Sequence, residues 1–520
     1  MAFVFIIVLS LIIHNKYINE FPVYIHSWAQ CDWYAMSSGF TDNGLDFFHP
    51  QTSIYNKQFP DWWASSSNST ITATDFPLHE YIIAIGMSIF GTTSPWIFRV
   101  WTLLISMAGM FFLYKLAYLL TKDFFKSLLT VGLALTAPVF AYYFCGFLPG
   151  IPSFAFSVAG LWAYFEYVYQ KKSPYFHISV ILLGIALLMR STYAIPLIAV
   201  LCYEFLRICL KESSWGNKLL SVIAVGAVYL AWHLWNGHLR AKYGSLFLNE
   251  LMPPQSLDNA KDIWLNVQER WKFQYFSKFQ HVFVAIIAVL SVVTSVYQRL
   301  KHKAQAENHQ SLSPWWFVVI YLFGCGLFVF AMMQQFSDHD YYFIDSLFLP
   351  ILLIFILLIG TLPTSEKLGF CVAEMIVAIS VIVLMTYQVR DILTERRYPN
   401  DRALQCAQHY QNSAKFLDDA HVDRKDKILA LFAYPQNAPF IQMERKGYIL
   451  MWYKPEIVQN VLASPFDYIV IENEMAAAEW NEHADMISHL RPIAHNEFLT
   501  LCCWSDSVCC HSFEEFEINP

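Results

Sequence analysis

Long runs of apolar residues recur along this chain of 520 residues, and they constrain its fold more than any other feature. A helix needs about 20 consecutive apolar residues to cross a bilayer. Ten segments approach or reach this length: 97–119, 126–146, 151–169, 174–189, 192–209, 217–236, 280–297, 314–333, 343–361 and 368–388. We interpret the shorter run Phe3–Ile13 as one more membrane helix, because no basic segment precedes it and no small-residue cleavage site lies before Lys16. The sequence therefore predicts a polytopic α-helical membrane protein with about eleven transmembrane helices.

The composition supports a protein that is exposed to lipid. Hydrophobic residues make up 56% of the chain and charged residues 14%, whereas a soluble domain has about 25% charged residues. Aromatic residues reach 17%, which is typical of a protein whose Trp and Tyr side chains lie at two membrane interfaces. The net charge of -7 argues against a nucleic-acid-binding protein, because nucleic-acid phosphates require a basic surface.

Basic residues in the short loops predict the orientation of the chain. By the positive-inside rule, loops rich in Lys and Arg face the cytoplasm. These loops contain Lys122, Lys126, Lys171, Lys172, Arg207, Lys211, Lys218, Arg299, Lys301, Lys303 and Lys367. The intervening segments are then external: 15–95, 146–150, the turn at Arg190, 237–279, 334–342 and the tail from about 390. We therefore predict a membrane domain at 1–389, with a large external loop at 15–95, and an external domain at 390–520.

The segment 390–520 has the pattern of a small α/β domain. Short β-type runs at 427–433, 467–472 and 498–504 alternate with helix-like stretches at 456–463 and 476–490. No Gly-rich phosphate loop follows the first two strands, which favours a structural or acceptor-docking domain over a catalytic one. Five cysteines lie in this domain, and a disulfide among them would require an oxidising compartment: Cys406, Cys502, Cys503, Cys509 and Cys510.

Ionisable residues of the first external loop are candidates for a functional site, because such residues are rare in membrane proteins and concentrate where function requires them. Asp32 follows Gln30 in a segment with helical spacing. It is either a solvated loop carboxylate or a functional group, and its aromatic and amide neighbours favour the second interpretation. Asp75 and His79 precede another helix, where Asp75 or Thr74 is either the N-cap or, for Asp75, part of a site.

Two further polar groups map to the same predicted side of the membrane. The sequence FSDHDYYFID lies between two membrane helices and contains His339, Asp340, Tyr341 and Tyr342. These residues are either ordinary interfacial residues with an aromatic belt or part of a site. Arg190 lies alone between two apolar segments, either as a snorkelling side chain or as a buried partner of a phosphate. Their common side favours a single site over unrelated interfacial residues.

At these positions the sequence resembles the GT-C superfamily of membrane glycosyltransferases. It is most similar to the bacterial branch related to the protein O-mannosyltransferases and the lipid A aminoarabinose transferases, whose first external loop has the approximate pattern HxWRQADT, then PQ, then EFPLY before a helix that ends in FG. The matching residues are His26, Trp28, Gln30, Asp32, Pro50, Gln51, Phe76, Pro77, Leu78, Phe90 and Gly91. The sequence HDYYFIDSLFLP (339–350) is similar to the HDYY segment of the family. The chain departs from the pattern at Ala29, where Arg is usual, and at Asp75, where Glu is usual.

The order of elements is similar over the whole membrane part, and the resemblance implies an enzyme. Such an enzyme moves a sugar from a polyprenyl-phosphate carrier to a protein, lipid or glycan acceptor on the outer face of the bacterial inner membrane. The resemblance implies that Asp32 is the catalytic base of an inverting transfer. Asp75 is then the second catalytic candidate, orienting the sugar or the acceptor. The absence of Arg at Ala29 leaves the charge partners of Asp32 open.

The remaining assignments concern the donor. Arg190 and His339 are assigned to its phosphate, because the leaving group develops negative charge. The further candidate substrate-binding residues are Gln30, His79, Asp340, Tyr341 and Tyr342. Some members of the superfamily use a divalent cation, but no ligand set in this sequence requires one, so no metal ligands are assigned.

A secondary transporter or lipid flippase is the main alternative. In such a protein Asp32, Arg190 and Asp340 would line a substrate path, and interrupted helices would occur at matching places in two halves of the chain. The ionisable residues instead avoid mid-helix positions and gather at one predicted face, which favours interfacial chemistry. A non-catalytic scaffold would leave the polar loop without a role. The sequence leaves the sugar, the acceptor and the length of the carrier open.

Overall fold

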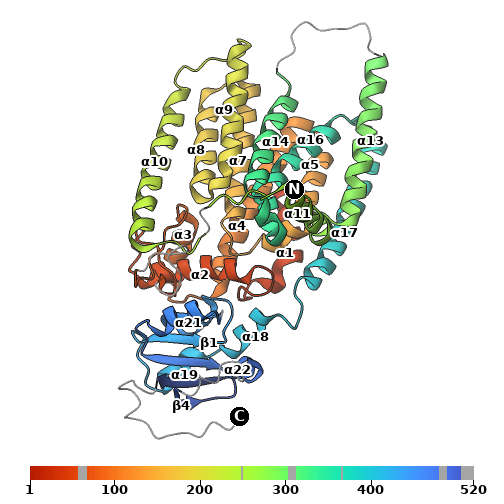
Figure 1. Ribbon diagram of the computed structural model, residues 1–520. Coiled ribbons are helices and arrows are strands. Elements are labelled where there is room, and N and C mark those ends of the chain that lie inside the picture. Colours follow the sequence, from red (N-terminus) through yellow and green to blue (C-terminus); the bar gives the residue numbers. More distant parts are fainter. Residues whose placement is uncertain are drawn as a thin grey trace. The chain divides into compact units, whose positions relative to one another are not determined.

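The computed structural model describes residues 1–56, 67–247, 250–301, 312–364, 367–451, 453–479 and 489–504 (Figure 1). Its contacts divide the chain into two compact units. Unit 1 consists of Met1–Ile18, Arg99–Ala231 and Asn249–Glu395, and unit 2 consists of Asn19–Phe98, Trp232–Leu248 and Arg396–Pro520. The C-terminal segment therefore shares a unit with most of the predicted first external loop, although the two are far apart in the sequence.

Unit 1 is a bundle of helices. Side-chain caps start several of them: Asp123 accepts a hydrogen bond from the Lys126 backbone at the start of α5, and Ser256 accepts one from the Asn259 backbone at the start of α11. The helices are α1 (Ala2–His14), α4 (Pro95–Thr121), α5 (Phe124–Leu135), α6 (Pro138–Tyr143), α7 (Gly150–Gln170), α8 (Ser173–Met189), α9 (Ala194–Cys209), α10 (Lys218–Tyr243), α11 (Leu257–Arg270), α12 (Lys272–Tyr275), α13 (Lys278–Lys301), α14 (Pro314–Ala331), α15 (Met333–Asp338), α16 (Leu349–Gly360) and α17 (Leu368–Glu395). Helix α10 extends into unit 2. A 3₁₀ turn η4 (Asp340–Phe343) and a π-helical turn η5 (Ile344–Phe348) precede α16.

Small residues allow helices of this bundle to pack closely. A Cβ atom on Gly109 of α4 would lie 2.6 Å from the Ala155 Cβ of α7, so only glycine permits this approach. Helix α7 packs along α8, and α14 packs along α9. The most apolar stretch of Asp340–Gly360 is 67% buried, whereas those of α10 and α17 are 11% and 17% buried. The last two helices thus expose apolar surface, as a lipid-facing helix does.

Seven of the described helical segments are long and apolar enough to cross a membrane: Pro95–Thr121, Ser191–Cys209, Lys218–Tyr243, Lys278–Lys301, Pro314–Ala331, Asp340–Gly360 and Leu368–Glu395. Four shorter apolar helices accompany them: Ala2–Tyr17, Leu78–Phe90, Phe124–Leu135 and Ser173–Met189. The number of crossings, about eleven, stays a prediction.

In unit 2, part of the predicted external loop folds into two helices. These are α2 (Ser27–Asp42) and α3 (Leu78–Phe90), which pack against each other. Helix α3 ends at Gly91, whose φ of 63° is a left-handed conformation that glycine adopts without strain. The loop thus presents its polar residues on regular helices.

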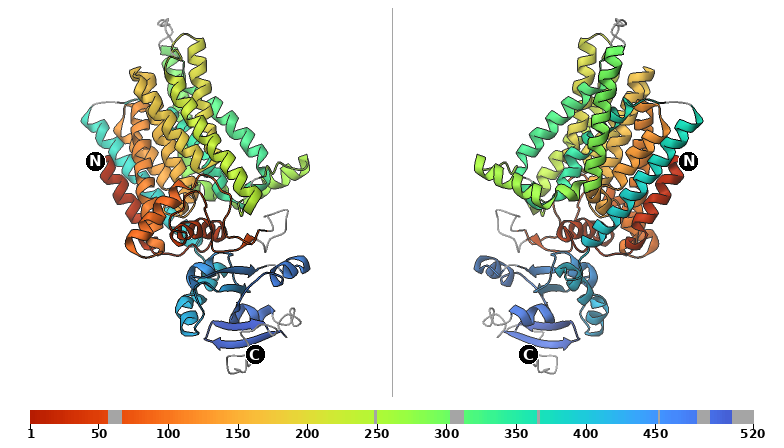
Figure 2. Two further views of the ribbon diagram at one scale, coloured as in Figure 1. Left: turned by 90° about the vertical axis from the view of Figure 1, so that its left-hand side faces the viewer. Right: turned by 90° about the vertical axis from the view of Figure 1, so that its right-hand side faces the viewer.

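The C-terminal part of unit 2 is a five-stranded sheet with helices packed on it (Figure 2). The strand order is β2-β1-β3-β5-β4. Strand β1 pairs in parallel with β2 and β3, while β5 runs antiparallel to β3 and β4. The strands are β1 (Lys427–Leu431), β2 (Lys446–Leu450), β3 (Tyr468–Glu472), β4 (Leu490–His495) and β5 (Leu499–Trp504). The helices are α18 (Arg402–His409), α19 (Ser413–Asp419), α20 (Ala438–Met443), α21 (Pro455–Leu462) and α22 (Asn473–Glu479).

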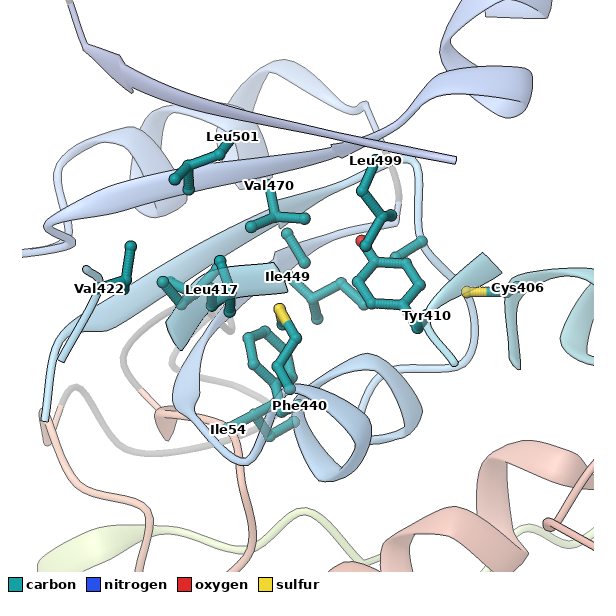
Figure 3. Packing of buried hydrophobic residues seen from close by; sticks show 14 of the residues in the cluster. Ile54, Cys406, Tyr410, Leu417, Val422, Phe440, Ile449, Val470, Leu499 and Leu501 are labelled. Carbon is teal, nitrogen blue, oxygen red and sulfur yellow. The ribbon is translucent and has the colours of Figure 1, made fainter. Parts of the chain in front are cut away.

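Alternate strand residues point to opposite sides of this sheet, and a hydrophobic cluster packs on each side. On one face, Ile449 and Val470 pack in a cluster with Tyr410, next to α18, and with Phe440 of α20 (Figure 3). Ile54, from the predicted external loop, belongs to the same cluster. A second cluster, on the other face, includes residues of α21 and α22. The loop and the sheet thus share one hydrophobic core.

The sequence predicted part of this domain correctly. The strands expected at 427–433, 467–472 and 498–504 are β1, β3 and β5, and the helix expected at 456–463 is α21. The helix expected at 476–490 is wrong at its end, because Leu490 begins β4; residues 480–488 lie outside the described residues. Strands β2 and β4 were missed, since glycine in one and proline in the other weaken a strand pattern.

The cysteines of this domain differ in state. Cys406 and Cys502 are free thiols, whereas Cys503 is disulfide-bonded. Cys509 and Cys510 lie outside the described residues.

Candidate active site

Asp32 lies on α2, where only 3% of it is exposed. Two amide side chains from the segment between β1 and α20 hold its carboxylate. Gln436 Nε2 donates to both oxygens, at 3.0 Å to Oδ1 and 3.1 Å to Oδ2. Asn437 Nδ2 donates to Oδ1 at 2.7 Å. Trp28, one helical turn before Asp32, adds a further side-chain hydrogen bond.

The surroundings of Asp32 change its acidity. Burial raises the pKa of Asp32 from 3.8 to about 7, while the hydrogen bonds from Gln436, Asn437 and Trp28 lower that pKa in part. All three donors, two amides and one indole, are neutral. Ala29 stands where the family that the sequence resembles has Arg, so neutral groups hold the Asp32 carboxylate here. A buried carboxyl group that titrates near neutral pH is suited to accept a proton from a hydroxyl group.

Gln30 and His79 have structural contacts of their own. Gln30 Nε2 donates to the Ile25 carbonyl at 3.1 Å, which ties α2 to the chain that enters it. His79 is buried on α3, edge-on to Phe98, with ring centroids 5.2 Å apart. Both residues lie in unit 2 with Asp32.

The helix cap expected of Asp75 or Thr74 is wrong. Pro77 occupies the N-cap of α3 and makes no capping hydrogen bond through its side chain. Asp75 is half-buried in the same unit. Nearby, Glu80 is buried, and its Oε1 has no hydrogen-bond partner among the described residues. Sequence reasoning missed Glu80, because a glutamate in the first turn of a helix is already explained by the helix dipole.

Arg190 is held by a buried carboxylate in unit 1. It ends α8, and its Nε donates to Asp345 Oδ2 at 2.8 Å. The side chains of Arg190 and Asp345 are 18% and 3% exposed. The guanidinium carbon also lies 5.7 Å from the centre of the Tyr342 ring. The guanidinium is therefore oriented by the protein on at least two sides.

Asp345 reaches this position because Gly150 leaves room for it. A Cβ atom on Gly150 would lie 2.2 Å from Asp345 Oδ1. Asp345 itself lies on the π-helical turn η5, a type of turn that occurs frequently at functional sites. Gly150 and the π turn together determine how Asp345 meets Arg190.

The four residues of the HDYY segment gather in the same unit. Asp340 is fully buried and accepts a hydrogen bond from the Tyr143 hydroxyl at 2.8 Å. The His339 ring lies 5.5 Å from that of Tyr341 and 6.0 Å from that of Tyr342, and the two tyrosine rings stack at 5.1 Å. Unit 1 thus brings this segment together with Arg190, whereas the candidates of the first loop all lie in unit 2.

Asp345, Gln436 and Asn437 were not among the predicted site residues. Asp345 ends the sequence FSDHDYYFID and lies three residues after the HDYY motif, so the motif did not include it. Gln436 lies 404 residues from Asp32, and an uncharged amide in a loop has no signature that links it to a distant carboxylate. Among the described residues, no group of three or more His, Cys, Asp or Glu side chains is arranged to hold a metal ion.

Comparisons with known proteins bear on both units. Residues 74–235 match the family of dolichyl-phosphate-mannose-protein mannosyltransferases. No curated protein matches the chain in sequence. The crystal structure of ArnT from Cupriavidus metallidurans bound to undecaprenyl phosphate is similar, with a TM-score of 0.62 and 10% identity over 96% of this chain and 97% of that chain. ArnT in the apo state has a TM-score of 0.52 and 11% identity over the same shares.

The fold is similar to that of ArnT: a mostly helical chain, in which seven described segments are long and apolar enough to cross a membrane, with a small C-terminal α/β region. Residues 74–235 relate part of the chain to the dolichyl-phosphate-mannose-protein mannosyltransferases, and the likeness to ArnT is one of fold. The fold class and the resemblance predicted from the first loop and the HDYY segment are confirmed.

Proposed function

We propose that this protein transfers a sugar from a polyprenyl-phosphate-linked donor to an acceptor hydroxyl group. The likeness of the fold to ArnT, whose crystal structure holds undecaprenyl phosphate, supports a lipid carrier of this type. The match to the mannosyltransferase family supports a glycosyl group as the moiety transferred. The acceptor is a protein, a lipid or a glycan. The reaction takes place on the outer face of the bacterial inner membrane.

The observation that carries this proposal is the buried Asp32 carboxyl group, with a pKa raised to about 7 by burial. The acceptor oxygen attacks C1 of the sugar, and the bond between C1 and the phosphate oxygen breaks. The hydroxyl proton passes to Asp32, and polyprenyl phosphate leaves with the electron pair. One displacement of this kind inverts the configuration at C1. A base whose pKa is near the ambient pH is efficient in such a step.

The unit 1 residues are assigned to the donor. Negative charge grows on the phosphate as the bond to C1 breaks, and a guanidinium stabilises it through paired hydrogen bonds. We assign this role to Arg190, with Asp345 orienting it, and to His339. Asp340, Tyr341 and Tyr342 are assigned to the same donor region, and Gln30, Asp75 and His79 to the sugar or acceptor.

The proposed topology follows from the loop charges. Residues 15–95 and 390–520 face the periplasm, and the membrane domain 1–389 anchors them, with the basic loops in the cytoplasm. The α/β domain then lies where acceptors of the cell envelope are available.

The test compares the wild-type protein with Asp32→Asn and the control Asp46→Asn in nanodiscs. Asp46 is an exposed carboxylate of the same loop, paired with His49. The donor is a bacterial lipid extract that contains polyprenyl-phosphate sugars with an isotope label, and the acceptor is a cell-envelope fraction. We expect label to leave the lipid with wild-type protein and the control, and to stay with Asp32→Asn. Lipid translocation without any sugar transfer by wild-type protein would support the transporter instead.

A further inference from the structure

Two of the side chains that donate hydrogen bonds to Asp32 come from a part of the chain that the proposed reaction does not otherwise use. Gln436 and Asn437 are both 0% exposed and lie in the segment that joins strand β1 to helix α20. Burying an amide costs free energy unless its polar atoms are paired. Two buried amides directed at one carboxylate therefore indicate a specific role.

Asn437 is a donor with a fixed direction. Its Oδ1 accepts a hydrogen bond from the Ser53 backbone N–H at 3.1 Å, and its Nδ2 donates to Asp32 Oδ1 at 2.7 Å. Turning the amide by half a turn would place oxygen against oxygen and NH₂ against N–H. Asn437 thus stays a donor whatever the charge of Asp32.

Gln436 is not restrained in this way. Its Nε2 faces both carboxylate oxygens, while its buried Oε1 has no hydrogen-bond partner among the described residues. Once Asp32 has taken a proton, its new O–H group needs an acceptor. A half turn of the Gln436 amide exchanges Nε2 for Oε1 in the same volume and supplies that acceptor.

We propose that Gln436 and Asn437 are positioning residues for Asp32. Asn437 fixes one carboxylate oxygen, and Gln436 matches the change of charge during proton transfer by turning its amide. The proposal rests on the proposed function in treating Asp32 as the base. The C-terminal domain then takes part in the reaction through another residue, without touching substrate.

The thiol and phenol groups beside this cluster stay neutral near pH 7. Burial raises the pKa of the Cys31 thiol, as does the charge of Asp32, and burial also raises the pKa of Cys406 and of Tyr434. Two charged residues, Asp401 and Arg402, act on Tyr434. A carboxyl band that titrates near pH 7 and is lost in Asp32→Asn therefore reports Asp32.

The first experiment needs no substrate. The infrared C=O band of protonated Asp32, assigned by its loss in Asp32→Asn, is followed from pH 4 to 10 in detergent. Gln436→Met removes the amide at similar volume. The matched control is Gln442→Met: Gln442 lies in α20, donates to the Ala407 carbonyl at 2.8 Å, and also has a buried, unpaired Oε1 among the described residues.

The expected results differ between the variants. Removing a donor to the carboxylate disfavours the charged form, so the midpoint should rise by about one pH unit or more in Gln436→Met and stay unchanged in Gln442→Met. Asn437→Asp keeps the acceptor for the Ser53 N–H but adds a second carboxylate, so its midpoint should rise further. The acid limb of the pH profile of kcat/KM should move with the infrared midpoint.

Each outcome decides the proposal. An unchanged midpoint in Gln436→Met would overturn it, as would lost activity at every pH without a shift, which indicates a purely structural role. A shifted midpoint in a protein that transfers no sugar would support the positioning of Asp32 and overturn the proposed function. If Asn437→Asp fails to fold, Gln436→Met alone decides.

Discussion

Replacing Asp32 by Asn is expected to separate catalysis from stability. In the folded protein the pKa of this carboxyl group is about 7, against a usual value of 3.8. The folded state therefore disfavours the charged form. At about 1.4 kcal/mol for each pH unit, the difference corresponds to about 4 kcal/mol of stability that the charged carboxylate removes.

The pH dependence of this cost follows from the direction of the pKa shift. Below about pH 4 the group is protonated in both folded and unfolded chains, so the cost is absent. It grows between about pH 4 and 7 and is complete above about pH 7. Asp32→Asn is neutral throughout, so we expect it to match wild-type stability at pH 4 and to exceed it at pH 8. The Gln436 amide can turn to accept from the new Nδ2–H.

The assay is unfolding of both proteins in one detergent at pH 4, 6 and 8, followed by tryptophan fluorescence, with sugar transfer measured on the same samples. Loss of a general base lowers the rate by roughly 10²–10⁴. We therefore expect a variant that is more stable at pH 8 and nearly inactive. A stability difference that does not change with pH would refute burial as the cause of the raised pKa, and retained transfer would refute the role of Asp32 as base.

Four further predictions concern other parts of the molecule. Arg190→Ala should weaken both donor binding and transfer, and Arg190→Lys should restore only part of each, as measured by donor titration. Unchanged donor affinity in Arg190→Ala would show that Arg190 is a snorkelling side chain that does not bind the donor phosphate. Gly150→Ala should lower the free energy of unfolding by about 1–3 kcal/mol in a denaturant titration, because the new methyl group overlaps Asp345. Asp467 Oδ2 accepts an exposed hydrogen bond from the Lys427 backbone N–H, and Asp467→Asn should leave turnover unchanged in the transfer assay. A cysteine placed at Lys171 should react with an impermeant thiol reagent only from the cytoplasmic side, and labelling from outside would reverse the topology.

Local patterns predicted the elements whose physical cause is local. Apolar length predicted most of the long helices, although the run expected at 126–146 is divided between α5 and α6 at Pro138. Continuous apolar runs predicted β1 and β3, because both of their faces are buried. The sequence did not predict strand β2, because Gly447 interrupts its apolar pattern. A Cβ atom on Gly447 would meet the Ile428 carbonyl oxygen. Its glycine is required by the partner strand, which the sequence of β2 alone does not reveal.

The candidate site was predictable only where charge made it visible. Asp32, Arg190 and Asp340 stand out in an apolar chain, and the structure adds the partners Gln436, Asp345 and Tyr143, respectively. These contacts depend on tertiary folding between segments more than 150 residues apart. The roles assigned to these residues stay predictions until the variants are measured.

The core shared by the loop and the sheet also sets an order of events during synthesis. Ser53 and Asn437 are 384 residues apart, so a ribosome that adds about 5–20 residues each second needs roughly 20–80 seconds to supply the partner of the first. During that interval Ile54 has no core to enter, and Asp32 has no amides to hold it. A chain that ends before β1 would insert its membrane helices but leave the loop unfinished. The Asp32 carboxylate thus gains its two amide partners only after the ribosome has synthesised the C-terminal segment.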